Sequence, residues 1–260
     1  MPGIAASTAL VFRTHLRRVW WSRRALACAV LALGPPGMAS IVASFTARSP
    51  AADIATHLGW LLLLQVVVPL LALVSGSAVV TEEIEDRTIT YLFSRPIPRA
   101  SVLLGRWLAS LVFVSTLLAA SALLTVAAAS RSSVAGPPLD AGIALPLLEA
   151  ALLGGAVYSA LFAAAGVFFR HPMIAGLGYA FAVEGVLANL PGENQALTVQ
   201  HYLRSLIAAS GSPAWRQVQG FELAHFDTAT RSVATLLVVI VAVLAAGSWR
   251  IARREFVLSA

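Results

Sequence analysis

The residues that could do chemistry are few and widely spaced. All eighteen basic residues are Arg, so the chain lacks the lysine of the phosphate-binding loop G-x-x-x-x-G-K-[ST]. A single cysteine, Cys28, excludes an intrachain disulfide and a Cys-based zinc site. None of the histidines has the i, i+4 spacing of a helical metal pair, and they fall in separate segments: His15, His57, His171, His201 and His225. We predict no metal, cofactor or nucleotide site on this chain.

Two carboxylates lie inside apolar stretches, at Glu149 and Glu184. An intramembrane carboxylate is by default a candidate functional residue. Glu184 is about seven residues, or ~10 Å, from the end of its stretch. It could line a substrate path or make a hydrogen bond to a neighbouring helix. Glu149 is closer to the end of its own stretch and could reach the membrane interface. Both are candidate substrate-path residues.

The composition indicates an all-α polytopic membrane protein. The chain is 58% hydrophobic and 12% charged, whereas a soluble domain is about a quarter charged. Six stretches reach the length of about 20 residues that a membrane-spanning helix needs: 25–45, 57–80, 100–130, 144–169, 172–190 and 231–249.

Prolines should kink the first of these stretches at 34–37 and bend the second at Pro69. Such breaks are tolerated in a membrane only where neighbouring helices satisfy the freed backbone groups.

The arginines set the expected orientation. Most of them lie before the first stretch, between the second and third, or after the last, which predicts that both termini are cytoplasmic. We expect one six-span domain over residues 25–260. A cleaved signal peptide is the alternative interpretation of the first stretch, although the basic segment before it is long for one.

Three connecting segments have patterns of their own. Residues 1–24 carry an apolar stripe with Arg on the other faces, which predicts an amphipathic elbow helix in the cytoplasmic interface, against membrane lipid and not nucleic acid. The outer loop at 191–230 predicts two short helices separated by a break at Gly211-Ser212-Pro213. A connection of only Arg170-His171-Pro172 predicts a tight hairpin between spans four and five.

The segment 81–99, TEEIEDRTITYLFSRPIPR, predicts a short cytoplasmic helix over about 81–95. Thr81 could cap its start, and Pro96 should end it. An acidic first turn is followed by an apolar stripe that includes Tyr91 and Leu92. This combination favours a docking surface for a protein partner; a solvated loop helix is the alternative.

An enzyme interpretation also exists for this segment. Glu82-Glu83 and Arg87 spell E-E-x-x-x-R, and Phe221 with His225 spells F-x-x-x-H. Both resemble motifs of glutamate-dependent intramembrane proteases, in which a Glu and His activate water. However, the expected topology places the two motifs on opposite sides of the membrane, and the H-x-x-x-N motif of that family is absent.

Residues 81–108, TEEIEDRTITYLFSRPIPRASVLLGRWL, resemble ABC exporter permeases of the ABC-2 class. Those membrane subunits read E-x-E-x-x-T-x-x-x-L-x-S-x-P-[IV]-x-R-x-x-x-L-x-G-[KR] after the second span. Arg87 departs from the pattern, because many members have Gly there. The matching positions are Glu83, Glu85, Thr88, Leu92, Ser94, Pro96, Ile97, Arg99, Leu103, Gly105 and Arg106.

The resemblance implies a transport subunit and not an enzyme. In such permeases the helix after span two is the coupling helix, which seats in a groove of a separate ATPase subunit that holds ATP and Mg. Two permease copies and two ATPase subunits form the working exporter in the bacterial inner membrane. The residues that this resemblance assigns to coupling are Glu82, Glu83, Glu85, Arg87, Thr88, Tyr91, Leu92 and Arg95.

A second use of the same scaffold stays open. The subunit could pass the strokes of the ATPase to a periplasmic partner without transporting anything. The substrate is not predicted, because the spans are built mostly from Ala, Leu, Val and Gly.

Overall fold

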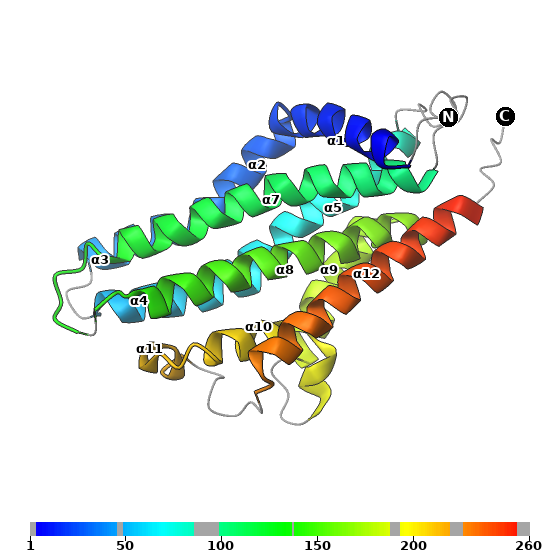
Figure 1. Ribbon diagram of the computed structural model, residues 1–260. Coiled ribbons are helices and arrows are strands. Elements are labelled where there is room, and N and C mark those ends of the chain that lie inside the picture. The colour runs from blue at the N-terminus through cyan, green and yellow to red at the C-terminus, as the bar shows by residue number, and fades with distance from the viewer. Residues whose placement is uncertain are drawn as a thin grey trace.

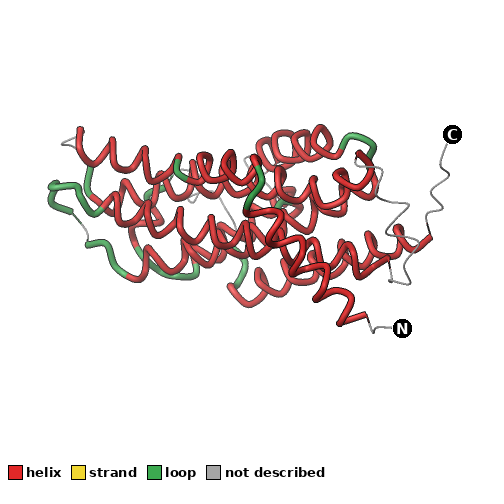
Figure 2. The backbone as a smooth tube through the Cα atoms, turned by 90° about the horizontal axis from the view of Figure 1, so that it is seen from above, coloured by secondary structure: helices red, strands yellow, loops and turns green. Residues whose placement is uncertain are grey.

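The computed structural model describes residues 4–45, 49–85, 99–136, 138–187, 193–218 and 226–253, with the backbone alone at 4–5, 80–85, 99 and 193. Within these ranges the chain is helical and contains no strand (Figures 1 and 2). The elements are α1 (Ile4–Trp20), α2 (Arg23–Ala32), α3 (Gly34–Phe45), α4 (Ala51–Leu58), η1 (Gly59–Val67), α5 (Val68–Glu85), α7 (Arg99–Ala129), α8 (Ala141–Phe168), α9 (Pro172–Gly178), η2 (Tyr179–Glu184), η4 (Glu193–Leu197), α10 (Val199–Ala208), α11 (Pro213–Arg216) and α12 (Ala229–Arg253). Both η1 and η2 are π-helical, and η4 is a 3₁₀-helix.

Five candidate membrane spans are present in the described residues, which confirms an all-helical, multi-pass architecture. They are Arg23–Phe45, Ala51–Val79, Ala100–Ala129, Ala141–Phe168 and Ala229–Arg253. The expected fifth span at 172–190 is helical from 172 to 187, and its last residues lie outside the described ranges. The six-span count therefore stays a prediction.

Helix α8 is the centre of the bundle and contacts α5, α7 and α12 (Figure 1). Small residues allow these helices to approach closely, as is typical of membrane bundles. A Cβ atom added at Gly155 would lie 2.6 Å from Cδ1 of Leu118, and one at Gly76 would lie 3.0 Å from the backbone oxygen of Ser159. The packing therefore depends on the absence of side chains at these positions.

The predicted break in the first span is confirmed, and a neighbouring helix compensates for it. The helix is interrupted at Leu33, a turn residue between α2 and α3. Pro36 has no N–H, so the oxygen of Ala32, four residues earlier, loses its helical donor. The hydroxyl of Ser121 on α7 donates to that oxygen at 2.6 Å.

The same arrangement occurs at Pro69. The π-helical register of η1 pairs each oxygen with the N–H five residues later, as Leu63 pairs with Val68. Leu64 would pair with Pro69, which has no N–H. The side-chain nitrogen Nε2 of Gln200 on α10 donates to the Leu64 oxygen instead, at 2.9 Å.

A third proline, Pro146, lies inside α8. It leaves the oxygen of Gly142 without its helical donor, and the indole nitrogen of Trp215 on α11 lies 3.3 Å from that oxygen. Both Gln200 and Trp215 come from the outer loop, whose position is therefore linked to two of the spans.

The outer loop is packed into the bundle and not laid on its surface. Helix α10 contacts α8 and α12, and most of its residues are buried. The predicted break is present at Gly211, whose φ of +71° is a conformation that favours glycine. Of the second expected helix, the described part is α11.

Removing the Ser121 hydroxyl should destabilise the fold by about 1–2 kcal/mol, because it leaves a buried carbonyl oxygen without a donor in an apolar bundle. We expect Ser121→Ala to lower the midpoint of thermal unfolding in detergent, followed by circular dichroism. In a Pro36→Ala background the restored N–H should supply the donor, so that Ser121→Ala costs little. Equal losses in both backgrounds would contradict this explanation of the kink.

Candidate functional site

The acidic residues of the predicted coupling segment begin inside a membrane-spanning helix. Helix α5 runs from Val68 through Glu85 without interruption, so the expected helix start at Thr81 is wrong: Thr81 lies within α5. The backbones of Glu82, Glu83 and Glu85 continue the helix of span two, because nothing in this stretch breaks it. The remaining predicted coupling residues lie outside the described ranges and stay predictions: Arg87, Thr88, Tyr91, Leu92 and Arg95.

The two helices that flank this segment are tied to each other. The guanidinium nitrogen Nη1 of Arg106 on α7 donates to the backbone oxygen of Val79 on α5 at 2.9 Å, and the Arg106 side chain is buried. Leu103, one turn earlier, packs against Val79 and Val167. Two positions of the sequence motif, Leu103 and Arg106, therefore hold the end of span two against the start of span three.

The elbow helix α1 packs directly on this same region. A Cβ atom at Gly105 would lie 2.8 Å from the backbone oxygen of Thr8 and 2.9 Å from Cβ of Val11. Gly105, which also belongs to the sequence motif, must therefore be small because α1 crosses over it. Helix α1 lies within the segment 1–24 that was predicted as an elbow helix; its position in the cytoplasmic interface, against lipid, stays a prediction.

His15 lies on the buried face of α1. It is not one of the apolar residues of the predicted stripe. Burial, together with the charges of Arg106 and Arg18, lowers the pKa of His15 from 6.5 to about 4. The imidazole is therefore neutral at physiological pH, in a region rich in guanidinium groups.

Glu184 makes a buried junction between two helices. Its Oε1 atom accepts hydrogen bonds from the Tyr179 hydroxyl and from the backbone N–H of Val199, both at 2.9 Å. Its Oε2 atom accepts from the backbone N–H of Gln200 at 3.1 Å. The carboxylate thereby satisfies the first N–H groups of α10, at the end where the helix dipole favours a negative charge.

The junction also forms the wall of a pocket of about 260 Å³. One side of it comes from η1 and the start of α5, including Gln65 and Pro69, and the other from η2, including Phe181 and Glu184. The two π-helical segments thus meet at one pocket. Gln200, whose Nε2 atom donates to the Leu64 oxygen, also lines it.

The two candidate substrate-path residues are in different surroundings. Glu184 makes hydrogen bonds to a neighbouring helix and also lines a pocket; its place on a substrate path stays a prediction. The side chain of Glu149 is exposed and does not line that pocket. Sequence reasoning missed Gln200. The signal that could have indicated it was Pro69, because the carbonyl oxygen that a proline leaves without a helical donor, here that of Leu64, needs a donor from another element.

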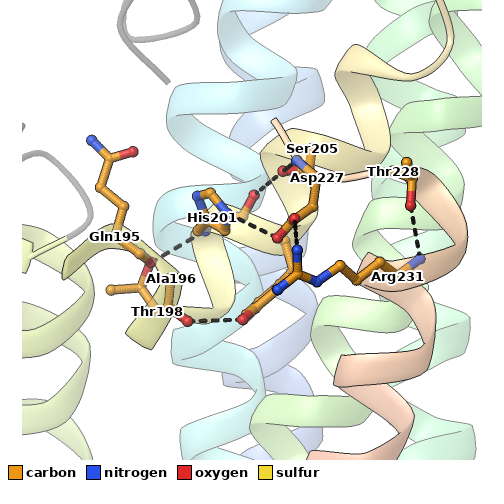
Figure 3. A network of polar contacts seen from close by, with 9 residues as sticks. Gln195, Ala196, Thr198, His201, Ser205, Asp227, Thr228 and Arg231 are labelled. Carbon is orange, nitrogen blue, oxygen red and sulfur yellow. Dashed lines mark hydrogen bonds and ion pairs between the residues drawn. The ribbon is translucent and has the colours of Figure 1, made fainter. Parts of the chain in front are cut away.

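A polar network fixes the start of α12 to α10 (Figure 3). Atom Nε2 of His201 lies 3.4 Å from Oδ2 of Asp227, and Arg231 pairs with Oδ1 of Asp227 at 2.9 Å. The hydroxyl of Ser205 donates to the backbone oxygen of His201 and accepts from the N–H of Asp227. The hydroxyl therefore bonds to backbone groups and not to the imidazole, which is not the arrangement of a nucleophile and its base.

No group of three His, Cys, Asp or Glu side chains that could hold a metal ion occurs among the described residues. His225, the other histidine of the outer loop and part of the protease interpretation, lies outside them, as does Phe221.

His15 should make stability depend on pH. Because its folded-state pKa is lowered from 6.5 to about 4, only the unfolded chain takes up a proton between these values, so the free energy of unfolding should fall as pH falls through this window. The loss is at most about 3 kcal/mol. We expect His15→Gln to reduce this slope in thermal unfolding between pH 7 and pH 4.5, and His171→Gln, at an exposed position, to leave it unchanged. Identical slopes for the wild type and His15→Gln would contradict the assignment.

Comparison with known families places this architecture. The model of the family described as "ABC-2 family transporter protein" matches residues 30–256, which is most of the chain. The comparison of the chain with curated proteins found no match. Subunits of this family are multi-pass membrane permeases that work with an ABC ATPase subunit and typically lack a nucleotide site of their own. The chain belongs to the ABC-2 family of transporter proteins and is an integral membrane permease subunit of an ABC transporter.

Proposed function

We propose that the chain is the membrane subunit of an ATP-driven exporter, and that the segment at about 81–95 is its coupling helix. The observation that carries the proposal is the continuity of α5 from the Glu184 pocket to the acidic residues at Glu82–Glu85. The helix contains 18 residues, or about 27 Å at 1.5 Å per residue. A displacement at its acidic end is therefore passed along one element to the pocket.

The surroundings of α5 support this path. Near its acidic end, the bond from Arg106 to Val79 joins α5 to α7, so both flanks of the coupling segment move together. Near its other end, Gln200 joins η1 to α10, whose first N–H groups are held by Glu184. ATP can drive such a change only by binding one conformation more tightly than the other.

The working unit in this proposal contains two copies of the chain and two ATPase subunits, which hold ATP and Mg. It lies in the bacterial inner membrane with both termini cytoplasmic. The start of α1 and the end of α12 lie at the same end of the bundle (Figure 1), which supports this orientation.

The Glu184 pocket is the proposed part of the substrate path in each copy. Its wall is largely apolar, with the carboxylate of Glu184 and the amide side chains of Gln65 and Gln200 as its polar members. A hydrophobic substrate with a hydrogen-bond donor would match these groups. Glu149, nearer the outer end, remains a second candidate on that path.

Truncating Tyr91 should weaken ATPase binding more than truncating Glu82. A buried aromatic side chain typically contributes more to an interface than an exposed charge at its rim. We expect Tyr91→Ala to reduce coupled ATPase activity in reconstituted complexes by at least tenfold, corresponding to about 1.4 kcal/mol or more, and Glu82→Ala to reduce it less. Tyr91→Phe should behave as the wild type. Equal effects of Tyr91→Ala and Glu82→Ala would count against a groove that binds the aromatic stripe.

Weakening the Glu184 junction should impair transport without preventing assembly. Glu184→Gln keeps the size of the side chain but loses charge-assisted hydrogen bonds worth about 1.5 kcal/mol, so transport into inverted vesicles should fall about tenfold. Asp140→Asn is the control for a carboxylate outside this pocket, because the Asp140 side chain is exposed and makes no hydrogen bond at the start of α8. ATPase binding should be unchanged in both variants. ATP hydrolysis that depends on the permease, with no substrate moved by the wild type, would favour a mechanotransmission role over export.

A further inference from the structure

A second pocket lies far along the chain from the coupling segment, between α8, α9 and α12. Its volume is about 330 Å³, and its wall is almost entirely apolar, with Leu161, Phe168, Phe169, Val243 and Ala246 among its residues. Leu161 and Phe168 are seven residues apart on α8, so the wall extends about 10 Å along the helix. The pocket therefore runs inward from the end of a membrane span.

A basic side chain lies against the wall of this pocket, and two further arginines are close in the sequence to its lining residues. The guanidinium carbon of Arg250 lies 6.0 Å from the centre of the Phe168 ring, which is part of the wall. Arg170 follows Phe169 directly in the chain, and its side chain is exposed. Arg253, one turn after Trp249, lies over that indole at 4.5 Å. The residues near this wall thus include aromatic rings and arginines.

No described acidic side chain lines this pocket. Asp53 is in α4, Asp140 and Glu149 are at the start of α8, and Asp227 precedes α12. Glu184 lines the other pocket. Among the side chains that the structure describes, the charged group shown against this wall is the guanidinium of Arg250.

The pocket also lies at the end of two candidate membrane spans, where lipid headgroups are expected. The candidate spans Ala141–Phe168 and Ala229–Arg253 both end here. Aromatic residues and Arg at span ends are typical of the membrane–water interface, and basic pockets between membrane helices on the cytoplasmic side bind anionic headgroups.

We propose that this pocket binds one anionic phospholipid, with part of an acyl chain in the cavity and its phosphate at Arg250 and Arg170. The apolar wall alone would not select a ligand, because lipid tails are as apolar as the side chains that they would contact. The arginines supply the selection, since they favour a lipid with net negative charge over a zwitterionic one.

The test is native mass spectrometry of the full-length chain, released from detergent with phosphatidylglycerol or phosphatidylcholine of identical acyl chains. We expect the first phosphatidylglycerol to bind more tightly than the first phosphatidylcholine. Arg170→Gln and Arg250→Gln should each weaken phosphatidylglycerol binding about fivefold, because each variant removes the contribution of one basic residue to binding an anionic headgroup. The two substitutions together should weaken it about 25-fold. The matched control is Arg131→Gln, an exposed arginine on the turn after α7, which should have no effect.

A second pair of variants tests the cavity itself. Ala246 and Ala245 are neighbouring exposed residues of α12, and of the two only Ala246 lines the pocket. Ala246→Leu should weaken the binding of both lipids, whereas Ala245→Leu should not. Unchanged midpoints of thermal unfolding would show that all variants are folded.

Three results would overturn the proposal. Equal retention of the two lipids would remove the role of the arginines. Displacement of phosphatidylglycerol by sodium phosphate at equal concentration would indicate a simple anion site. Loss of a dimer peak with Ala246→Leu would indicate that a second copy of the chain fills the cavity. None of these measurements involves the ATPase, so their outcome is independent of the proposed export function.

Discussion

Backbone groups inside a membrane have no water to bond with, and this constraint explains much of how the bundle is held together. Three prolines interrupt the helical ladders of three different spans. In each case a side chain from another element donates to the freed oxygen: Ser121 to Ala32, Gln200 to Leu64 and Trp215 to Gly142. The breaks are therefore the points at which separate helices are joined. The outer loop provides two of the three donors, so its folding and that of the spans depend on each other.

Glu184 applies the same rule to a helix terminus. The start of α10 is buried, and its first N–H groups need acceptors that water cannot supply. Both carboxylate oxygens are used for this purpose, with Tyr179 as a further donor. A carboxylate so placed is structural in the conformation described, and it also forms part of a pocket wall. Any movement of η2 relative to α10 would expose its oxygens to that pocket.

Sequence reasoning found the elements better than their junctions. Hydropathy predicted the five candidate spans, and the proline positions predicted the break near Leu33, because length and backbone chemistry are local properties. The cap at Thr81 was misplaced, since a local preference for a helix start was overridden by the continuing helix of span two. The partners of the freed carbonyls could not be predicted, because Gln200 and Leu64 are brought together only by tertiary packing. His15 was missed for the same reason: the face of α1 that packs on α7 is set by Gly105 on the other helix.

The π-helical segments suggest where a stroke of the ATPase would be absorbed. Such segments are rare and often occur at functional sites, because their wider register is less stable than an α-helix. Helix α5 is regular from Val68 to Glu85 and is braced by Arg106, so it should move as a rigid unit. The element that directly precedes α5 in the chain is the π-helical η1, and it faces the π-helical η2 across the Glu184 pocket. In the proposed coupling, a displacement of α5 would therefore reach this pocket through η1, as well as the helices α7 and α8 that α5 contacts directly.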